Sequence, residues 1–172
     1  MTGSWRDYLS LDDPSLLAQC EFDRFRAGGP GGQKRNKTES AVRLRHRPTG
    51  VQGEANESRS QHENRARALR RLRLTIALTL RAPINLDDSA PSPQLAAALQ
   101  RAPSRRAPDL LPTLAELFDV LEACVWRIRD AATLLGVPSA AVSRVLQLDD
   151  DVWRAAAQRR QAHGLTPLRA QQ

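Results

Sequence analysis

Alternating apolar and polar residues predict a short antiparallel sheet near the start of the chain. Residues 20–26 alternate in this way, and so do residues 40–46. Residues 47–50 read as a turn, and residues 51–56 as a weaker returning strand that Gly53 weakens further. The side chains that we expect to face the core from the first two strands are Cys20, Phe22, Val42 and Leu44.

A period of about 3.6 residues predicts a long helix after the strands. It begins at Ser58 or Ser60, where Ser60 and Glu63 have the spacing of a capping box, and it ends near Leu80. A shorter helix is expected over residues 11–20, with Asp13 as its cap. The long helix has an apolar stripe of Leu69, Leu72, Ile76 and Leu80, and a basic side with Arg67, Arg70 and Arg71.

The second half of the chain predicts helices and no strands. Residues 82–110 carry five prolines and read as a linker with one helical turn around residues 95–99. Residues 113–160 are expected to be helical, with a capping box at Thr113 and Glu116, a break at residues 136–138, and Trp126 and Trp153 in the core. The predicted fold is therefore α+β: a domain over 1–81, a Pro-rich linker over 82–110, a helical, helix-turn-helix-like domain over 111–162, and a tail over 163–172.

Charge is concentrated where the strands and the long helix are predicted. The 172 residues carry a net charge of +7, yet residues 22–81 hold 15 Lys and Arg against five Asp and Glu. Such an excess is the footprint of a polyanion-binding surface, with RNA or DNA as the leading ligand and a merely solvated basic surface as the alternative. No stretch has the ~20 apolar residues that a membrane span needs. We expect a cytoplasmic protein whose two cysteines, Cys20 and Cys124, are free and buried.

The glycine-rich segment 27–33 is the sharpest chemical feature. Four glycines and a proline in seven residues predict a loop, and the absence of Walker spacing excludes a phosphate-cradling P-loop. The residues that follow resemble the peptidyl-tRNA hydrolase domain of class I peptide chain release factors and of smaller ribosome-rescue relatives. The matching blocks, between about Gln19 and Leu74, are Gly31-Gly32-Gln33, Asn36-Lys37-Thr38, Ser40 to Leu44, Pro48-Thr49-Gly50, and Arg59-Ser60-Gln61 with Asn64.

This resemblance implies a catalytic loop formed by Gly31, Gly32 and Gln33. In the family the main-chain N–H of the glutamine stabilises the oxyanion formed when the ester between peptide and tRNA is hydrolysed. Gln33 is also a candidate for N5-methylation by a glutamine methyltransferase. No metal or other cofactor is expected. The implied partners are large-subunit ribosomal RNA and peptidyl-tRNA, and no membrane is implied.

The residues expected to bind RNA are basic side chains after the loop, on the second strand and on the long helix. They are Lys34, Arg35, Lys37, Arg43, Arg45, Arg59, Arg67, Arg70 and Arg71. His46 and His62 are interpreted as surface or RNA-contacting residues. Arg59, Ser60 and Asn64 could hold the base of the loop or cap the long helix. A structural role is favoured for Ser60, whereas Arg59 is left open between a structural role and RNA binding.

Several features favour ribosome rescue over codon-dependent termination. About 20 residues precede the resemblance, and no tripeptide resembles a codon-reading motif. A further feature argues against one mode of rescue. The tail after residue 162 contains only Arg169 as a basic residue, whereas rescue factors that act in an empty mRNA channel insert a basic tail into it. The leading hypothesis is codon-independent hydrolysis of peptidyl-tRNA on stalled ribosomes or large subunits. The alternatives are an RNA-binding protein with a vestigial loop and, less favoured, a DNA-binding regulator whose helix-turn-helix lies over residues 129–146.

Overall fold

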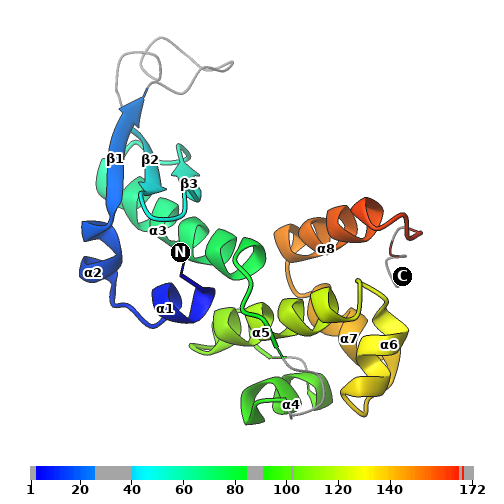
Figure 1. The fold of residues 1–172 in the computed structure, drawn as a ribbon. Coiled ribbons are helices and arrows are strands. Elements are labelled where there is room, and N and C mark those ends of the chain that lie inside the picture. The colour runs from blue at the N-terminus through cyan, green and yellow to red at the C-terminus, as the bar shows by residue number, and fades with distance from the viewer. Residues whose placement is uncertain (1–2, 26–39, 85–90, 102, 167, 169–172) are drawn as a thin grey trace. The chain divides into compact units, whose positions relative to one another are not determined.

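A computed structural model describes residues 3–25, 40–84, 91–101, 103–166 and 168 (Figure 1). The chain divides into two compact units, Met1–Thr79 and Leu80–Gln172. Among the described residues, the first unit contains helices and a sheet, and the second contains helices alone. The α+β class expected from the sequence is confirmed.

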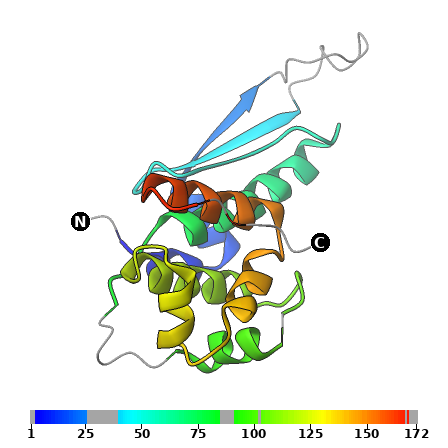
Figure 2. The same ribbon diagram turned by 90° about the vertical axis from the view of Figure 1, so that its right-hand side faces the viewer.

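The first unit is built on a three-stranded antiparallel sheet with strand order β1-β2-β3 (Figure 2). Phe25 at the end of β1 pairs with Ala41 at the start of β2, and Leu44 of β2 pairs with Gly53 of β3. The elements are α1 (Trp5–Leu9), α2 (Asp13–Ala18), β1 (Cys20–Phe25), β2 (Ala41–His46), β3 (Gln52–Ala55) and α3 (Gln61–Thr79).

Helix α3 packs against β2 and β3, and this contact forms the core of the first unit. Val42 and Leu44 are fully buried on β2, and they meet the buried stripe of Leu69, Leu72 and Ile76 on α3. The two patterns are confirmed for these residues. Leu80, which was expected in the same stripe, lies beyond the end of α3 and is half-buried. The predicted cap is also present, because the hydroxyl of Ser60 accepts a hydrogen bond from the backbone N–H of Glu63 at 3.3 Å.

Gly53 allows α3 to lie with its backbone directly against β3. A Cβ at this position would lie 2.3 Å from the carbonyl oxygen of Ala68 and 2.5 Å from the backbone nitrogen of Leu72. Those distances are too short for any side chain, and the obstructing atoms belong to the helix backbone. The sequence interpretation of Gly53 as a weak point of the strand is therefore incomplete, since the glycine is what permits the close packing of helix on sheet.

Two expectations for the first unit are wrong in detail. Phe22 does not face a core: 41% of it is exposed, because α3 covers β2 and β3 and leaves this part of β1 open. The cap of α2 is Asp12, whose carboxylate accepts from the N–H of Ser15, and Asp13 is the first residue of the helix.

The second unit packs five described helices around a leucine-rich core. They are α4 (Pro93–Gln100), α5 (Leu110–Ala123), α6 (Ile128–Leu134), α7 (Ser139–Leu146) and α8 (Asp150–Ala162). Phe118 and Trp126 meet edge to face with their ring centroids 5.0 Å apart, and both side chains are fully buried. Helix α4 lies within the segment expected to be a linker, and its Leu95 and Leu99 are buried because it packs against α5 and α7.

The helical segment differs from expectation at three places. Helix α5 begins at Leu110, so Thr113 is a buried residue inside the helix and not a cap. The chain also breaks after Ala123, where Val125 and Trp126 take positive φ angles of 50° and 58°. A β-branched valine in this region gives no sequence signal for a turn. Finally, Trp153 is only half-buried, whereas the break at Gly136, with φ of 65°, is confirmed.

A buried ion pair joins the start of the second unit to α5. Arg81 lies 3.1 Å from the carboxylate of Asp119, and it donates to the carbonyl oxygen of Ala115 at 3.0 Å. Asp119 also accepts from the backbone N–H of Ala82 at 3.0 Å. Burial lowers the pKa of Arg81 to about 10, while the charge of Asp119 opposes that shift. The guanidinium therefore stays protonated at neutral pH.

Candidate nucleic-acid interface

The predicted catalytic segment connects the paired ends of β1 and β2. Phe25 and Ala41 are Cα partners, so the residues between them leave and re-enter the sheet at one end of the hairpin. Six predicted site residues, namely Gly31, Gly32, Gln33, Lys34, Arg35 and Lys37, lie outside the described residues. What the structure does describe is the base to which this segment is attached.

Asn64 on α3 holds the returning side of that base. Its side-chain amide donates to the backbone carbonyl of Ser40 at 2.6 Å and to that of Ser58 at 2.7 Å. Its carbonyl oxygen accepts from the N–H of Ser58 at 3.0 Å, and the whole residue is buried. Sequence analysis left Asn64 between two roles, holding the base of the loop or capping the long helix, and these hydrogen bonds support the first. The structure identifies it as the residue that connects α3 to the chain entering β2.

His46 is buried, which contradicts its interpretation as a surface residue. One ring nitrogen lies 2.7 Å from the hydroxyl of Thr49, and the other lies 3.0 Å from the side-chain oxygen of Gln19. The rings of Tyr8 and His46 meet edge to face with their centroids 4.5 Å apart. Burial lowers the pKa of His46, so the neutral form is favoured. The histidine is a structural link between β2, the following turn and α1.

Four of the predicted RNA-binding arginines form ion pairs with carboxylates of the same unit. Arg45 lies 3.8 Å from Glu21, and Arg67 lies 3.7 Å from Glu63 one helical turn away. Arg43 pairs with Asp23 and Glu54, and the hydrogen bond to Glu54 raises the pKa of Arg43. Arg71 pairs with Glu57 and donates to the backbone carbonyl of Glu54. These guanidinium groups are exposed, but their charges are already partly balanced.

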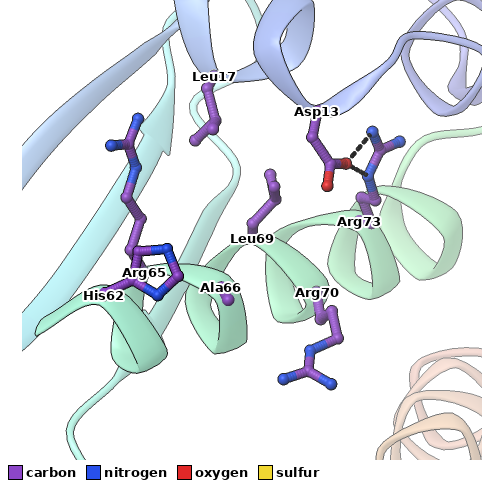
Figure 3. A pocket seen from close by; sticks show the side chains of 8 residues that line it. All are labelled: Asp13, Leu17, His62, Arg65, Ala66, Leu69, Arg70 and Arg73. Carbon is purple, nitrogen blue, oxygen red and sulfur yellow. Dashed lines mark hydrogen bonds and ion pairs between the residues drawn. The ribbon is translucent and has the colours of Figure 1, made fainter. Parts of the chain in front are cut away.

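Two predicted arginines, Arg59 and Arg70, form no ion pair or hydrogen bond with any residue that the structure describes. Arg70 lines a cavity of about 440 Å³ between α2 and α3, together with His62 and Arg65 (Figure 3). Arg65 was not among the predicted site residues. The signal that could have found it is helical spacing, since positions 62, 65, 66, 69 and 73 share one face of α3.

Within the described residues, no group of three or more His, Cys, Asp or Glu side chains could hold a metal ion. Cys20 and Cys124 are free, as expected, but both are only partly buried. Burial raises the pKa of each thiol, which makes them weaker nucleophiles than an exposed cysteine. No described helix combines the length and apolar character needed to cross a bilayer.

Helices α6 and α7 have the order and the turn of a helix-turn-helix. Ala132 and Val142 are buried between them, and Gly136 makes the turn. The residue best suited to reading a nucleic acid, Arg144, donates to the backbone carbonyl of Leu99 at 3.4 Å. Residues 149–151 are three aspartates at the start of α8, where they would repel a phosphate backbone. These contacts favour a packing role for this pair of helices.

Comparison with known proteins locates the similarity in the first half of the chain. Residues 17–100 match the family model described as the RF-1 domain. The chain is 60% identical over 53 residues to peptide chain release factor 1 of Caldicellulosiruptor bescii, 57% over 56 residues to that of Acidiphilium cryptum, and 56% over 52 residues to that of Nitrosomonas europaea. These segments cover 31%, 33% and 30% of this chain, but only 15%, 16% and 14% of the relatives. No solved structure gave a significant match.

Proposed function

Because residues 17–100 match the RF-1 domain of class I release factors, we propose that this protein hydrolyses the ester of peptidyl-tRNA on the ribosome. The observation that carries the proposal is the position of Gly31-Gly32-Gln33 within residues 17–100, the segment that matches the RF-1 domain model. The described frame fits this role, because β1, β2 and Asn64 fix both ends of the chain that carries the loop.

The proposed chemistry needs little from ionisable side chains. The ester is already activated, so a catalyst has mainly to orient a water molecule and stabilise the oxyanion that forms when the water attacks. The backbone N–H of Gln33 is the proposed oxyanion donor, and its side chain helps to admit the water. A single donor of this kind is worth ~2.7–4 kcal/mol of barrier. Gly31 and Gly32 have no Cβ to restrict the backbone beside it.

We further propose that hydrolysis does not depend on a stop codon and that the natural substrate is a stalled ribosome or a large subunit. Support comes from the second unit, whose described residues form only helices. The ribosomal RNA and peptidyl-tRNA partners, and methylation of Gln33, belong to the same proposal.

The test is a peptide-release assay on three substrates in parallel. They are ribosomes stalled with an empty A site, ribosomes programmed with a stop codon, and isolated large subunits carrying peptidyl-tRNA. The proposal expects release from a stalled ribosome or a large subunit without a stop codon. Release only at a stop codon would contradict codon independence, and binding without any release would favour the vestigial-loop alternative.

Gly32→Ala is the decisive variant for catalysis. Adding a Cβ beside Gln33 should lower the release rate by about a hundredfold or more, the loss expected for one oxyanion donor. Ribosome binding should remain, because no charge is removed. Gly50→Ala is the control for loss of stability: no atom lies within 4 Å of the added Cβ, but the φ of +71° makes the alanine backbone strained. If destabilisation alone lowered release, it would do so in this variant too. If Gly32→Ala releases peptide at the wild-type rate, the enzymatic proposal is wrong.

A further inference from the structure

Phe22 is an exposed aromatic side chain on the face of the sheet that α3 covers elsewhere. Its partner in register is the buried Leu44, so both residues point to the same face. Helix α3 packs over β2 and β3 but leaves Phe22 41% exposed. A single exposed apolar residue is common and means little by itself. The side chains around Phe22 indicate what this exposed ring could bind.

Two guanidinium groups stand beside the Phe22 ring. The Arg24 guanidinium lies 5.5 Å from the ring centroid, and that of Arg65 lies 5.7 Å from it. Neither arginine forms an ion pair with a carboxylate among the described residues, in contrast to Arg43 and Arg45 on the neighbouring strand. An exposed π face with two uncompensated cations is an arrangement that suits a ligand with both an aromatic ring and negative charge.

Arg65 also lines the cavity between α2 and α3. Leu17 and Leu69 point toward one another in this cavity, and His62 stands at its end near Arg65 (Figure 3). The cavity contains one carboxylate, Asp13, which Arg73 neutralises at 2.7 Å. Its lining is therefore apolar at the centre and positive in net charge, and its volume of about 440 Å³ is in the range of small-ligand sites.

We propose that Phe22, Arg24 and Arg65, with the adjoining cavity, form a subsite for one nucleotide of single-stranded RNA. The base stacks on Phe22, and the phosphate lies between the Arg24 and Arg65 guanidinium groups. RNA is favoured over an acidic peptide because a carboxylate chain has no planar ring to occupy the exposed aromatic face. The subsite rests on the proposed function for the identity of its RNA, which is a ribosomal or tRNA strand.

The test measures binding of the full chain to an oligouridylate of about eight nucleotides by fluorescence anisotropy, without ribosomes. Phe22→Leu keeps an apolar side chain and removes the π face, so affinity should fall by about 5- to 150-fold, the range that corresponds to one stacked base. The dependence on salt should not change. Phe22→Trp keeps an aromatic face, so its affinity for the oligouridylate should stay close to that of the wild type. Circular dichroism of both variants establishes that the strand is intact.

Arg65→Gln tests the phosphate contact against a matched control. Loss of one phosphate contact to a single strand should reduce the slope of log affinity against log salt by about 0.7. Arg67→Gln, two positions along the same helix, removes an equal charge from a residue already paired with Glu63, and its slope should change less. Equal slopes for the two variants would overturn the subsite, and so would wild-type affinity in Phe22→Leu.

Two further outcomes separate this proposal from its alternatives. Competition by oligoglutamate as effective as that by RNA would show a general anion site and would overturn the stacking role. A release assay on the same variants separates the subsite from the proposed function. If oligouridylate binding follows the expected pattern while the wild type releases no peptide, the subsite stands and hydrolysis is wrong. If release is normal and Phe22→Leu binds oligouridylate like wild type, the subsite is wrong and hydrolysis stands.

Discussion

The two compact units differ in how deeply the carboxylates that pair with their arginines are buried. In Met1–Thr79, 15 Lys and Arg stand against nine Asp and Glu, and the described arginine ion pairs are mostly exposed. In Leu80–Gln172 the numbers are 11 and ten, and the central arginine, Arg81, is buried against Asp119. The carboxylates separate the units: every one that pairs with an arginine of the first unit among the described residues is at least 38% exposed, whereas Asp119 is fully buried.

This contrast shows that the number of arginines identifies a polyanion-binding unit but not the residues that bind. Arg67 and Arg70 are three positions apart on α3 and looked equivalent in the sequence. The structure separates them, because Arg67 pairs with Glu63 whereas Arg70 lines the cavity beside α2. Ion pairing and burial, which depend on the fold, determine which guanidinium groups can bind a ligand.

The largest expected effect lies in the buried pair of the second unit. Asp119→Asn keeps an acceptor for the N–H of Ala82 but removes the carboxylate charge that lies 3.1 Å from the Arg81 guanidinium. Removing one partner of a buried ion pair costs about 3–5 kcal/mol of the free energy of unfolding. Urea denaturation measures the loss, and native-state hydrogen exchange should show it in the amides of α5.

A second substitution sharpens this result. Arg81→Met in the Asp119→Asn background removes the uncompensated charge, so the double variant should be more stable than Asp119→Asn alone. A loss below about 1 kcal/mol in the single variant would mean that solvent screens the pair as it does a surface salt bridge. The two units would then use arginine in the same way.

The next effect belongs to the first unit and involves no charge. Gly53→Ala places a Cβ against the backbone of α3, 2.3 Å from the carbonyl oxygen of Ala68. Helix and sheet must move apart, and overpacking of this kind costs about 1–3 kcal/mol or more. Gly50→Ala separates overlap from backbone strain, since its added Cβ meets no atom within 4 Å but its φ of +71° is unfavourable for alanine. In Gly53→Ala, hydrogen exchange should increase in β3 and α3 and remain unchanged in α5; unchanged exchange in α3 would exclude steric overlap as the cause.

The sequence predicted the sheet, the long helix and the helical second half because each has a clear period. The same period could have corrected one error. Positions 42, 44 and 46 alternate inward on β2, so His46 belongs with Val42 and Leu44. Its basic neighbours made it look like a surface residue. The prediction that Phe22 is buried was wrong for a different reason. Alternation identifies the correct face of the sheet, but whether a helix covers that face depends on tertiary packing.

The candidate site was predictable only in part. The loop motif and the resemblance followed from local blocks of sequence, and residues 17–100, which contain these blocks, match the RF-1 domain model. The sequence offered two roles for Asn64, holding the base of the loop or capping the long helix. Its hydrogen bonds to Ser40 and Ser58, 24 and six positions away, depend on the fold and favour the first role. The Val125–Trp126 break was also out of reach, because neither residue type favours a left-handed backbone.

His46 should give the first unit a dependence on pH. Its pKa is lowered from 6.5 by burial, so the unfolded chain binds a proton more readily than the folded one. Stability should therefore be fully present above pH 6.5 and fall as the pH drops below it. Urea denaturation at about pH 8 and about pH 5.5 should show a larger loss in wild type than in His46→Gln, which cannot titrate. Equal losses in the two proteins would assign the effect to other groups.

The smallest effect is expected from the exposed pair of Arg67 and Glu63, and it completes the comparison with Arg81 and Asp119. Both pairs join an arginine to a carboxylate, but the Arg67 and Glu63 side chains are 40% and 57% exposed. An exposed pair one helical turn apart is worth about 0.3–0.5 kcal/mol. Glutamine has a helix propensity close to that of arginine, so Arg67→Gln changes little else.

A double-mutant cycle of Arg67→Gln with Glu63→Gln isolates the pair energy. It should stay below about 0.5 kcal/mol and disappear at about 1 M salt, where the screening length is ~3 Å. The corresponding change at Asp119 should be nearly insensitive to salt, because solvent ions do not reach the buried pair. A coupling energy of several kcal/mol at Arg67 would contradict the comparison, since it would show that exposure does not separate the structural arginine of the second unit from the surface arginines of the first.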